Sequence, residues 1–339
     1  MSYRRILPAA VLAAVCLTGC AKSEPQEYST DLFAMDTYMQ LKVWNTDDGA
    51  SLDAAAARIA ALENTFSVTI DGSDIARVNH AAGAPTQVSE DTALLIRKAQ
   101  EIGDASGGAL DISLYPVLCA WGFTTGEMHV PDPETLDTLL GQVDYTKIGL
   151  DGNTVTLPAD MEIDLGALAK GYTSDEVIRI FRESGAESAI VSLGGNVQAL
   201  GSKPDGSKWK VGIVDPFSPS ENMGVVEIEN QAVITSGNYE RYFEENGQKY
   251  WHILDKADGE PADNGLVSVT IIGDSGLQCD ALSTALFVEG TQDAVAHWQR
   301  DGGFEMLLVT EDGRMLVTEG IADAFTNRSA MPMEVISHE

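Results

Sequence analysis

The stretch from residue 164 to residue 171 reads Asp-Leu-Gly-Ala-Leu-Ala-Lys-Gly and lies between a helical part of the chain and a strand-rich part. It places a carboxylate and several small residues directly before a helix that we expect from about Tyr172 to Glu183. Small residues leave the backbone open to close approach by a ligand, and a helix N-terminus favours negative charge. The stretch therefore predicts a place for phosphate groups or a metal ion.

Two amphipathic helices are expected before this stretch, after a strand in which Met39, Leu41 and Val43 alternate with polar residues. Ser51 can cap the first helix, and Ser89 can cap the second, which should end at Gly107-Gly108. Each helix carries apolar residues on one face at helical spacing. These residues are Leu52, Ala55, Ile59, Leu62 and Phe66 in the first helix, and Leu94, Leu95, Ala99 and Ile102 in the second.

Short β-rich segments follow the quoted stretch, at residues 188–193, 208–214, 224–228, 266–272 and 306–309, and another precedes it at 154–157. Turn signals separate these segments. Because the helices are grouped rather than alternating strictly with strands, we predict an α+β fold with mixed or antiparallel sheets and packed helices. One catalytic domain is expected over residues 31–335.

The N-terminus predicts a lipoprotein signal peptide over residues 1–19. Arg4 and Arg5 precede an apolar run, Ile6 to Leu17, that is too short to span a bilayer stably. Leu17 to Cys20 resembles a lipobox, in which Cys20 receives the lipid. Residues 20–30 would then be the lipidated cysteine and a flexible polar tether. We expect a protein anchored to the cell membrane on its extracytoplasmic side, facing a periplasm or the cell surface.

The strongly negative net charge of the chain limits which molecules it can bind. The chain has 21 basic and 52 acidic residues, for a net charge of −31. Nucleic acid and anionic membrane surfaces are therefore poor partners. A site for an anionic ligand would need a local device such as a metal ion, a helix N-terminus or backbone amides. Cys119 and Cys279, the cysteines that remain in the predicted body, indicate buried free thiols rather than a disulfide framework.

Further motifs carry polar groups into loops. Asp280 and Thr284 lie at i and i+4, so on a helix they share one face and could both ligate a hard cation, although taken alone capping of a helix start explains them slightly better. His252 stands three residues before Asp255, a spacing compatible with proton transfer, although a lone histidine is usually structural. Glycine pairs and hydroxyl groups follow strands in two other motifs, Ser192 to Asn196 and Ile234 to Arg241.

Taken in order, these motifs resemble the ApbE family of flavin transferases, the FAD:protein FMN transferases. The resemblance extends from Phe33 to about Phe325. It rests on motifs at many loop positions: Met35-x-Thr37, Phe66-Ser67 with Ser73 and Asn79, Gly108 to Asp111 leading to Trp121-Gly122-Phe123, Asp164 to Asp175, Gly194-Gly195-Asn196, Thr235-Ser236-Gly237, His252 to Asp255 with Gly259, and Asp280 to Thr284 with Gly290.

The resemblance implies an ApbE-like, T-fold-like flavin transferase fold and a role for each matched residue. Asp280, Thr284 and the carbonyl of Ala167 would hold Mg²⁺. The FAD site would be lined by Met35, Ala109, Leu110, Asp111, Asp164, Lys170, Leu254 and Ser283, with Thr235, Ser236 and Gly237 as its wall. His252 is the candidate for proton transfer, directly or through Asp255.

The implied reaction is attack by a Thr or Ser hydroxyl of an acceptor protein on the FMN phosphorus of FAD, with release of AMP. The resemblance suggests that the acceptors are flavin-carrying subunits of membrane or surface redox systems.

Three departures from the family pattern bear on this reaction. Asp36 stands where the family commonly has glycine, and Asn238 replaces a more usual acidic or small residue. Thr69 occupies a position where an aromatic residue often follows Phe66-Ser67. If that aromatic residue excludes water, its absence would favour hydrolysis of FAD to FMN and AMP. One alternative is therefore an FAD pyrophosphatase. A non-catalytic FAD-binding lipoprotein is a separate alternative from another functional class.

Overall fold

The structure is a computed structural model that describes residues 25–45, 47 and 49–338. The predicted signal peptide and Cys20 lie outside the described residues. A nine-stranded sheet forms the centre of the molecule, and its neighbouring strands are antiparallel except for the parallel pair β15 and β17. In spatial order its strands are β1 (Gln26–Ala34), β2 (Thr37–Asn45), β6 (Ser188–Leu193), β7 (Asn196–Leu200), β10 (Ala232–Gly237), β13 (Leu266–Gly273), β14 (Glu305–Thr310), β15 (Met315–Thr318) and β17 (Met333–Ile336).

Three smaller sheets accompany it. They are β16 (Phe325–Asn327), β9 (Ser218–Ile228) and β8 (Trp209–Asp215); β3 (Thr86–Gln87), β5 (Thr154–Thr156) and β4 (Gly149–Asp151); and the hairpin of β11 (Tyr242–Glu245) and β12 (Gln248–Trp251). Buried residues of β8 and β9 pack against β14 and β15, so this sheet covers one face of the large sheet.

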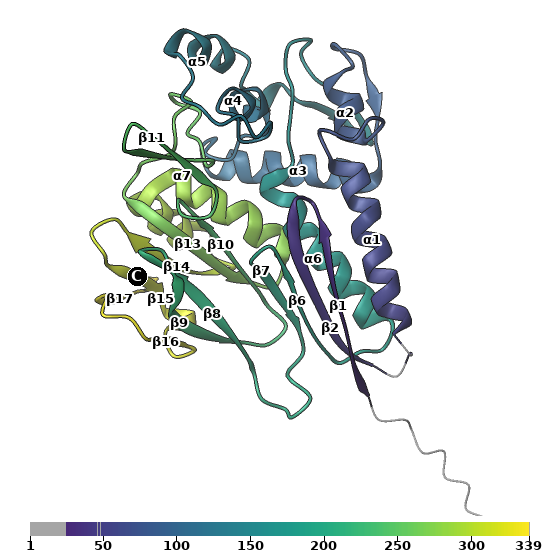
Figure 1. Ribbon diagram of the computed structural model, residues 1–339, viewed down its shortest axis with the longest axis vertical. Helices are drawn as coiled ribbons and strands as arrows, with labels where there is room; N and C mark the ends of the chain where they lie inside the picture. The colour runs from purple at the N-terminus through teal and green to yellow at the C-terminus, as the bar shows by residue number, and fades with distance from the viewer. Residues whose placement is uncertain (1–24, 46, 48, 339) are drawn as a thin grey trace, which may run out of the picture.

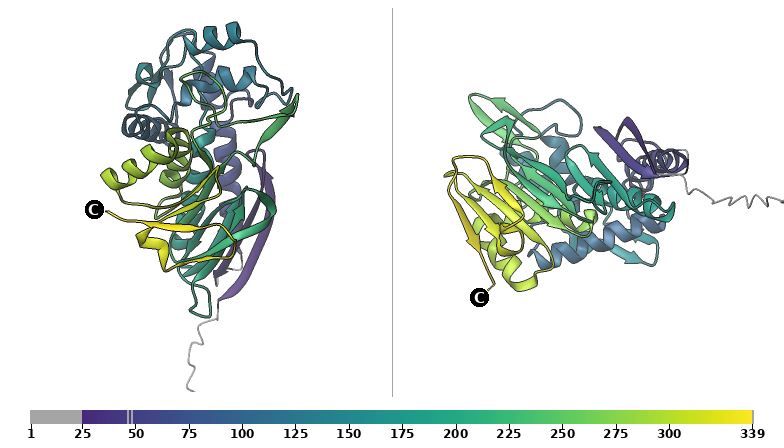
Figure 2. Two further views of the ribbon diagram at one scale, coloured as in Figure 1. Left: turned by 90° about the vertical axis from the view of Figure 1, so that its left-hand side faces the viewer. Right: turned by 90° about the horizontal axis from the view of Figure 1, so that it is seen from below.

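The helices gather on the opposite face and at one end of the molecule (Figures 1 and 2). They are α1 (Ala50–Phe66), α2 (Asp74–Asn79), α3 (Glu90–Ala105), α4 (Tyr115–Ala120), α5 (Pro133–Leu140), α6 (Gly166–Glu183), α7 (Gly276–Asp301) and α8 (Glu319–Ala322), with 3-10 turns η1 (Ile112–Leu114) and η2 (Tyr145–Lys147). Grouped helices on a mostly antiparallel sheet confirm the predicted α+β class. Within the described part of the chain, no helix combines the length and apolarity needed to cross a membrane.

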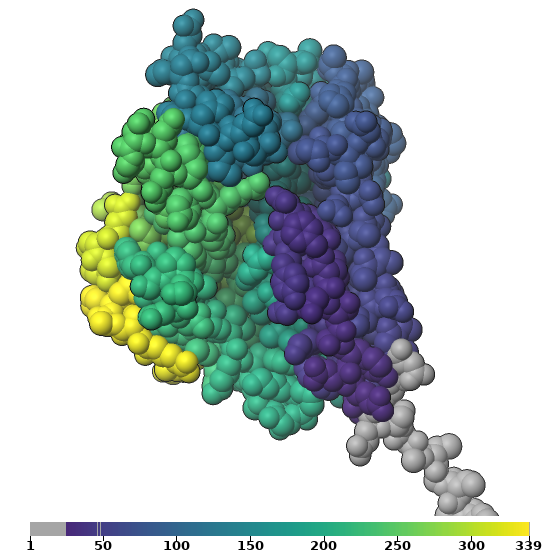
Figure 3. Space-filling model, viewed as in Figure 1, coloured from purple at the N-terminus to yellow at the C-terminus, as the bar shows by residue number. Residues whose placement is uncertain are grey.

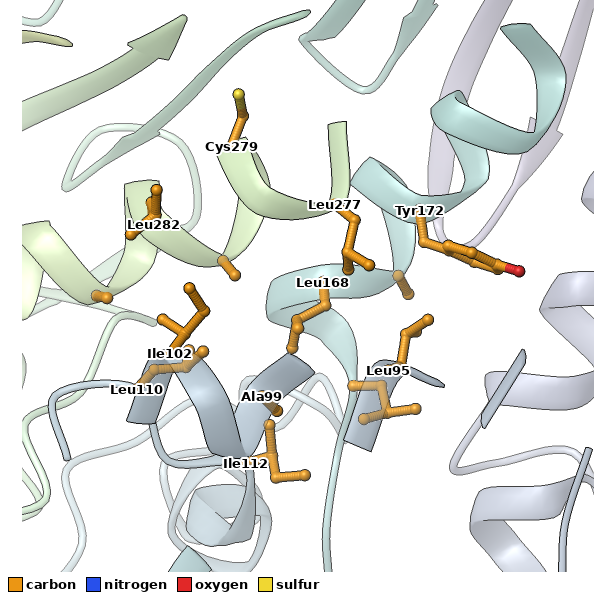
Figure 4. Packing of buried hydrophobic residues seen from close by; sticks show 14 of the residues in the cluster. Leu95, Ala99, Ile102, Leu110, Ile112, Leu168, Tyr172, Leu277, Cys279 and Leu282 are labelled. Atoms are coloured by element: carbon orange, nitrogen blue, oxygen red, sulfur yellow. The ribbon is translucent and has the colours of Figure 1, made fainter. Parts of the chain in front are cut away.

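The main core forms where α3, α6 and α7 meet, and Figure 4 shows side chains from all three helices in contact. Leu95 and Ala99 come from α3, Leu168 from α6, and Leu277 and Leu282 from α7. Each is less than about a tenth exposed, and burial of a leucine side chain contributes roughly 1.5–3 kcal/mol. This core fixes α6 and α7 relative to each other.

Two glycines let α6 and α7 cross closely. A Cβ atom on Gly171 would lie 2.2 Å from the carbonyl oxygen of Gly276 and 2.6 Å from Cβ of Asp280. A Cβ atom on Gly276 would lie 2.4 Å from Oγ of Ser174. Only glycine fits at either position, and both lie inside or at the start of a helix despite their poor helix propensity.

Several local predictions are corrected by the structure. The third helix begins at Gly166 rather than Tyr172, because close packing against α7 outweighs the low helix propensity of its glycines. The first helix has Gly49 at its N-cap, and Asp47 accepts the backbone N–H of Ser51 in place of a cap by Ser51. Ser89 does cap α3, as predicted, by accepting the backbone N–H of Thr92.

Leu94 was expected in the core but is 39% exposed, because α3 buries Leu95 and Ile96 instead.

The last residues of the flexible tether predicted for residues 20–30 belong to a strand instead. β1 begins at Gln26 and pairs with β2 along its whole length, which supplies backbone hydrogen bonds to a segment that looks polar and loop-like in sequence. Cys279 is buried and free, and Cys119 is free but only half-buried.

Replacing Gly171 by alanine should lower the free energy of unfolding by about 1–3 kcal/mol, because the new methyl group must push α6 away from α7. Gly141→Ala is the matched control, since its Cβ atom would meet nothing nearer than the Thr138 carbonyl oxygen at 3.3 Å. Urea unfolding of both variants measures the difference. Equal stability of the two variants would contradict the close crossing.

Candidate active site

The sequence motifs converge on one cavity of about 300 Å³. Figure 3 shows this face of the molecule hollowed between the β1–β2 hairpin, the segment around β11 and the segment that follows α3. The predicted residues that line the cavity are Met35, Ala109, Leu110, Asp111, Asp164, Ala167, Lys170, Thr235, Ser236, His252, Leu254, Asp280 and Thr284. They come from six separate parts of the chain, which the fold brings together.

Asp280 lies at the α6–α7 crossing and is only 5% exposed. One carboxylate oxygen accepts the backbone N–H of Gly171 at 2.8 Å, and the other accepts the Asn196 side-chain amide at 3.0 Å. Burial raises the pKa of this carboxyl, while the charge of Lys170 and the two hydrogen bonds oppose the shift. Each oxygen keeps a further lone pair that can ligate a cation.

The position of Asp280 along α7 is fixed by Asp175 of α6. Its carboxylate accepts the backbone N–H groups of Gly276 at 2.7 Å and Leu277 at 3.0 Å, which are the first donors of α7. It also accepts the Ser275 hydroxyl and the Gln198 side-chain amide. A carboxylate is favoured at a helix N-terminus, so this contact holds α7 in register with α6.

Hydroxyl groups adjoin Asp280 on the next turn of α7. The Thr284 hydroxyl lies 3.4 Å from the Ser236 hydroxyl, and both residues line the cavity. Ser283 was predicted to line the site but is fully buried behind Ser236, with its hydroxyl 2.8 Å from that of Ser236 and donating to the Asp280 carbonyl. Gly237 is also buried outside the cavity lining.

The N-terminus of α6 points at the cavity. Asp164 precedes the helix and accepts the backbone N–H of Gly166 at 2.7 Å, and Ala167 lines the cavity one residue later. Burial raises the pKa of Asp164. The partial positive charge of the helix N-terminus suits a phosphate group.

Asp111 lines the opposite wall, but its lone pairs are largely used by the protein. It accepts the backbone N–H and the hydroxyl of Ser113 and the backbone N–H of Tyr145, and it pairs with Lys256 at 3.5 Å. It is thus the cap of η1 as well as a wall residue. This structural role was not anticipated from the sequence.

His252 and Glu240 face the same cavity. Burial lowers the pKa of His252 to about 4, and the charges of Arg241 and Lys170 act in the same direction. The imidazole is therefore neutral at pH 7. Burial raises the pKa of Glu240 to about 7 against the opposing charge of Lys170, although its side chain is open to the cavity. Glu240 lies in the motif Ile234 to Arg241 that the sequence singled out, but it was not itself predicted as a site residue, because its burial depends on distant segments.

The predicted contact between Asp255 and His252 is not found in the structure. It lies outside the cavity lining, in a neighbouring groove, where its carboxylate accepts the backbone N–H of Ala257. His252 instead contacts the carbonyl oxygen of Arg241 through Nδ1 at 3.2 Å. Because the hydrogen bonds found among the described residues include none between His252 and Asp255, the predicted relay has no support.

The structure also gives the positions of Asp36 and Thr69, two of the residues that depart from the family pattern. Asp36 lies at the cavity rim, with a carboxylate oxygen 3.6 Å from the guanidinium of Arg241. Thr69 is exposed, hydrogen-bonds to Ser67 and does not line the cavity. The suggestion that Thr69 opens the site to water is therefore not supported by its position.

The cavity presents four carboxylates, from Asp111, Asp164, Glu240 and Asp280, and two cations, from Lys170 and Arg241. The ion pairs found beside it join Asp36 with Arg241 and Asp111 with Lys256, so none of those described involves Asp280.

In the described part of the chain, no three His, Cys, Asp or Glu side chains are grouped to hold a metal ion. The oxygen donors around Asp280 nevertheless fit Mg²⁺, which commonly uses one or two carboxylates and takes further ligands from phosphates and water.

Comparison with known proteins agrees with the motifs. The sequence profile of the ApbE family matches residues 35–308. A protein of Treponema pallidum named FAD:protein FMN transferase is 32% identical, with 89% of this chain and 90% of that protein covered. A protein of the same name from Escherichia coli K12 is 29% identical, with 92% and 94% covered.

Solved structures show the same likeness. The crystal structure of the ApbE protein from Thermotoga maritima superposes with a TM-score of 0.82 at 31% identity and covers 87% of this chain and 98% of that chain. The flavinyl transferase ApbE of Pseudomonas stutzeri, in its apo form, gives a TM-score of 0.77 at 28% identity, with 86% and 94% covered. The predicted ApbE-like fold is confirmed by these structures.

The imidazole of His252 should titrate with a pKa of about 4, well below the ordinary histidine value of about 6.5. NMR of the histidine rings in the ligand-free protein between pH 3 and 8 measures it, and His252→Asn identifies the resonance among the five histidines. A titration midpoint near pH 6.5 for this ring would contradict the lowering of its pKa by burial and by the charges of Arg241 and Lys170.

Proposed function

The chain belongs to the ApbE family and is a flavin transferase, and on that premise we propose that it transfers FMN from FAD to a Thr or Ser hydroxyl of another extracytoplasmic protein. The acceptor oxygen forms a bond to the FMN phosphorus, and the bond between this phosphorus and the oxygen shared with the AMP phosphate breaks. AMP leaves, the acceptor keeps FMN through a phosphoester, and nothing is oxidised or reduced.

The observation that carries the proposal is the buried Asp280 carboxylate, which lines the cavity and takes part in none of the ion pairs found among the described residues. Asp280, Thr284 and the Ala167 carbonyl would hold Mg²⁺ there, with FAD phosphates and water as the remaining ligands. When bound, Mg²⁺ would neutralise the charge that develops on the leaving phosphate, an effect worth several kcal/mol. It would also offset the carboxylates of a cavity that otherwise repels an anion.

Residues of the chain itself bind and orient FAD in this proposal. Lys170 and the N-terminus of α6 attract the diphosphate. Met35, Leu110 and Leu254 give the cavity apolar surface against which a flat ring system can pack. Thr235 and Ser236 form the polar wall on β10.

His252 accepts the proton of the acceptor hydroxyl in this account. Its low pKa keeps the ring neutral and ready to accept, and the negative charge of a bound diphosphate would raise its basicity toward neutrality. Arg241 lies beside His252 and would stabilise the negative charge of the bound diphosphate.

The lipid anchor at Cys20 and the extracytoplasmic location remain part of the proposal. They rest on the sequence from Arg4 to Cys20. An anchored transferase would serve membrane or surface redox proteins, whose flavin-carrying subunits we propose as acceptors.

The direct experiment incubates the detergent-solubilised full chain with FAD, Mg²⁺ and the envelope fraction of cells that lack this protein. We expect flavin-fluorescent bands on a denaturing gel, a mass increase corresponding to FMN on a peptide that contains Thr or Ser, and one AMP released for each FMN attached. Release of AMP without labelling would instead indicate an FAD pyrophosphatase. Bound FAD with neither product would indicate a non-catalytic binding protein.

Asp280→Ala should lower the rates of both FMN transfer and FAD cleavage by at least about 100-fold, because loss of a metal ion in such sites removes several kcal/mol of stabilisation. Asp53→Ala, which removes an exposed carboxylate of α1, is the matched control and should change neither rate. AMP release measured by chromatography gives both rates. An unchanged rate for Asp280→Ala would remove the proposed metal site.

A further inference from the structure

The solvent-exposed face of the β1–β2 hairpin changes character along its length. Its exposed positions on β1 are Glu27, Ser29, Asp31 and Phe33, and those on β2 are Tyr38, Gln40 and Lys42. All of these are polar except at one end, where Phe33 is 71% exposed and Tyr38 is 54% exposed. Trp44 lies on the same face at the other end, but it is half-buried against Trp209 of β8, so the exposed large apolar side chains of this face are gathered at one end of the hairpin.

Phe33 and Tyr38 lie directly opposite each other in the β1–β2 register, so their side chains share one face and adjoin. Singly exposed apolar side chains are common on protein surfaces, but adjoining large ones indicate an interaction site. Aromatic side chains are also the residues that most often carry binding energy at the centre of protein interfaces.

This aromatic pair lies at the mouth of the cavity. Met35 and Asp36 form the turn between Phe33-Ala34 and Thr37-Tyr38; Met35 lines the cavity, and Asp36 pairs with Arg241 on the opposite rim at 3.6 Å. Figure 3 shows the tip of the hairpin bordering the hollow.

The turn is held in an unfavourable conformation. Met35 and Asp36 have φ values of 50° and 57°, a left-handed region that costs side-chain-bearing residues roughly 1–3 kcal/mol each. Contacts from elsewhere keep it there, because Glu63 accepts the Met35 backbone N–H at 2.7 Å and the Thr173 hydroxyl oxygen lies 3.6 Å from the Met35 sulfur. The aromatic pair is thus presented at a fixed place beside the cavity.

We propose that Phe33 and Tyr38 form the docking surface for the acceptor polypeptide, which places an apolar side chain against them next to its target hydroxyl. The inference rests on the proposed function, because transfer requires a second polypeptide to bring a hydroxyl into this cavity. That polypeptide must pass the rim that these residues occupy. Neither residue lines the cavity, so they act on the acceptor and not on FAD.

The test compares variants of the detergent-solubilised full chain in the labelling reaction with FAD, Mg²⁺ and the envelope fraction of cells that lack the protein. For the double variant Phe33→Ala/Tyr38→Ala, we expect the apparent KM for the envelope acceptor to rise at least about 10-fold. Affinity for FAD and any AMP release without acceptor should stay as in the wild type. Tyr38→Phe, which keeps the ring, should label normally.

Met333→Ala is the matched control, because Met333 is 40% exposed on β17 at the opposite edge of the same sheet. It should leave the KM for the acceptor unchanged. If the double variant does not bind FAD and is therefore misfolded, Phe33→Ala alone replaces it, since the more exposed side chain contributes little to folding. The single variant should still raise the KM several-fold.

An unchanged KM in a folded variant that binds FAD would overturn the docking surface while leaving the transferase intact. The docking surface would also be overturned if light scattering showed that the substitutions only convert a dimer to a monomer. Phe33 and Tyr38 would then contact a second copy of the chain. If the wild type itself labels nothing, the proposed function fails and the docking surface fails with it. The two failures are therefore distinguishable.

Discussion

The structure depends on how the Asp280 carboxylate is held where α6 and α7 cross. Gly171 supplies both the space for the crossing and the backbone N–H that the carboxylate accepts, and Asn196 supplies the second hydrogen bond. A buried carboxylate is costly unless it is hydrogen-bonded and paired with a cation. The protein provides the hydrogen bonds, and the adjoining cavity gives access to a cation, so one interaction joins the packing of the helices to the chemistry of the site.

Much of this arrangement could be predicted from sequence because its parts are local. Capping of α3 by Ser89 and the alternation along β2 depend on neighbouring residues, and both appear as expected. Asp280 and Thr284 share a helix face because their spacing is one helical turn. The order of the motifs identifies the family. The resemblance to that family in turn predicts that motifs far apart in sequence meet in one cavity.

The remaining features depend on contacts between distant segments, which spacing does not reveal. Gly171 is needed where α7 lies against α6, Ser283 lies buried against Ser236, and Asp255 accepts the Ala257 backbone N–H outside the cavity lining, although it is only three residues from His252. The capping of α7 by Asp175 joins residues a hundred positions apart in sequence. Glu240 has a raised pKa because of burial, which no sequence pattern indicates.

A crystal of the full chain grown with FAD and with Mn²⁺ in place of Mg²⁺ would show whether Asp280 anchors the metal used with FAD. We predict an anomalous peak about 2.1–2.2 Å from an Asp280 carboxylate oxygen, close to the Thr284 hydroxyl and to the FAD phosphates, by analogy with the oxygen distances of small hard cations. Bound FAD with no peak at Asp280, or with the peak at another group of residues, would contradict it.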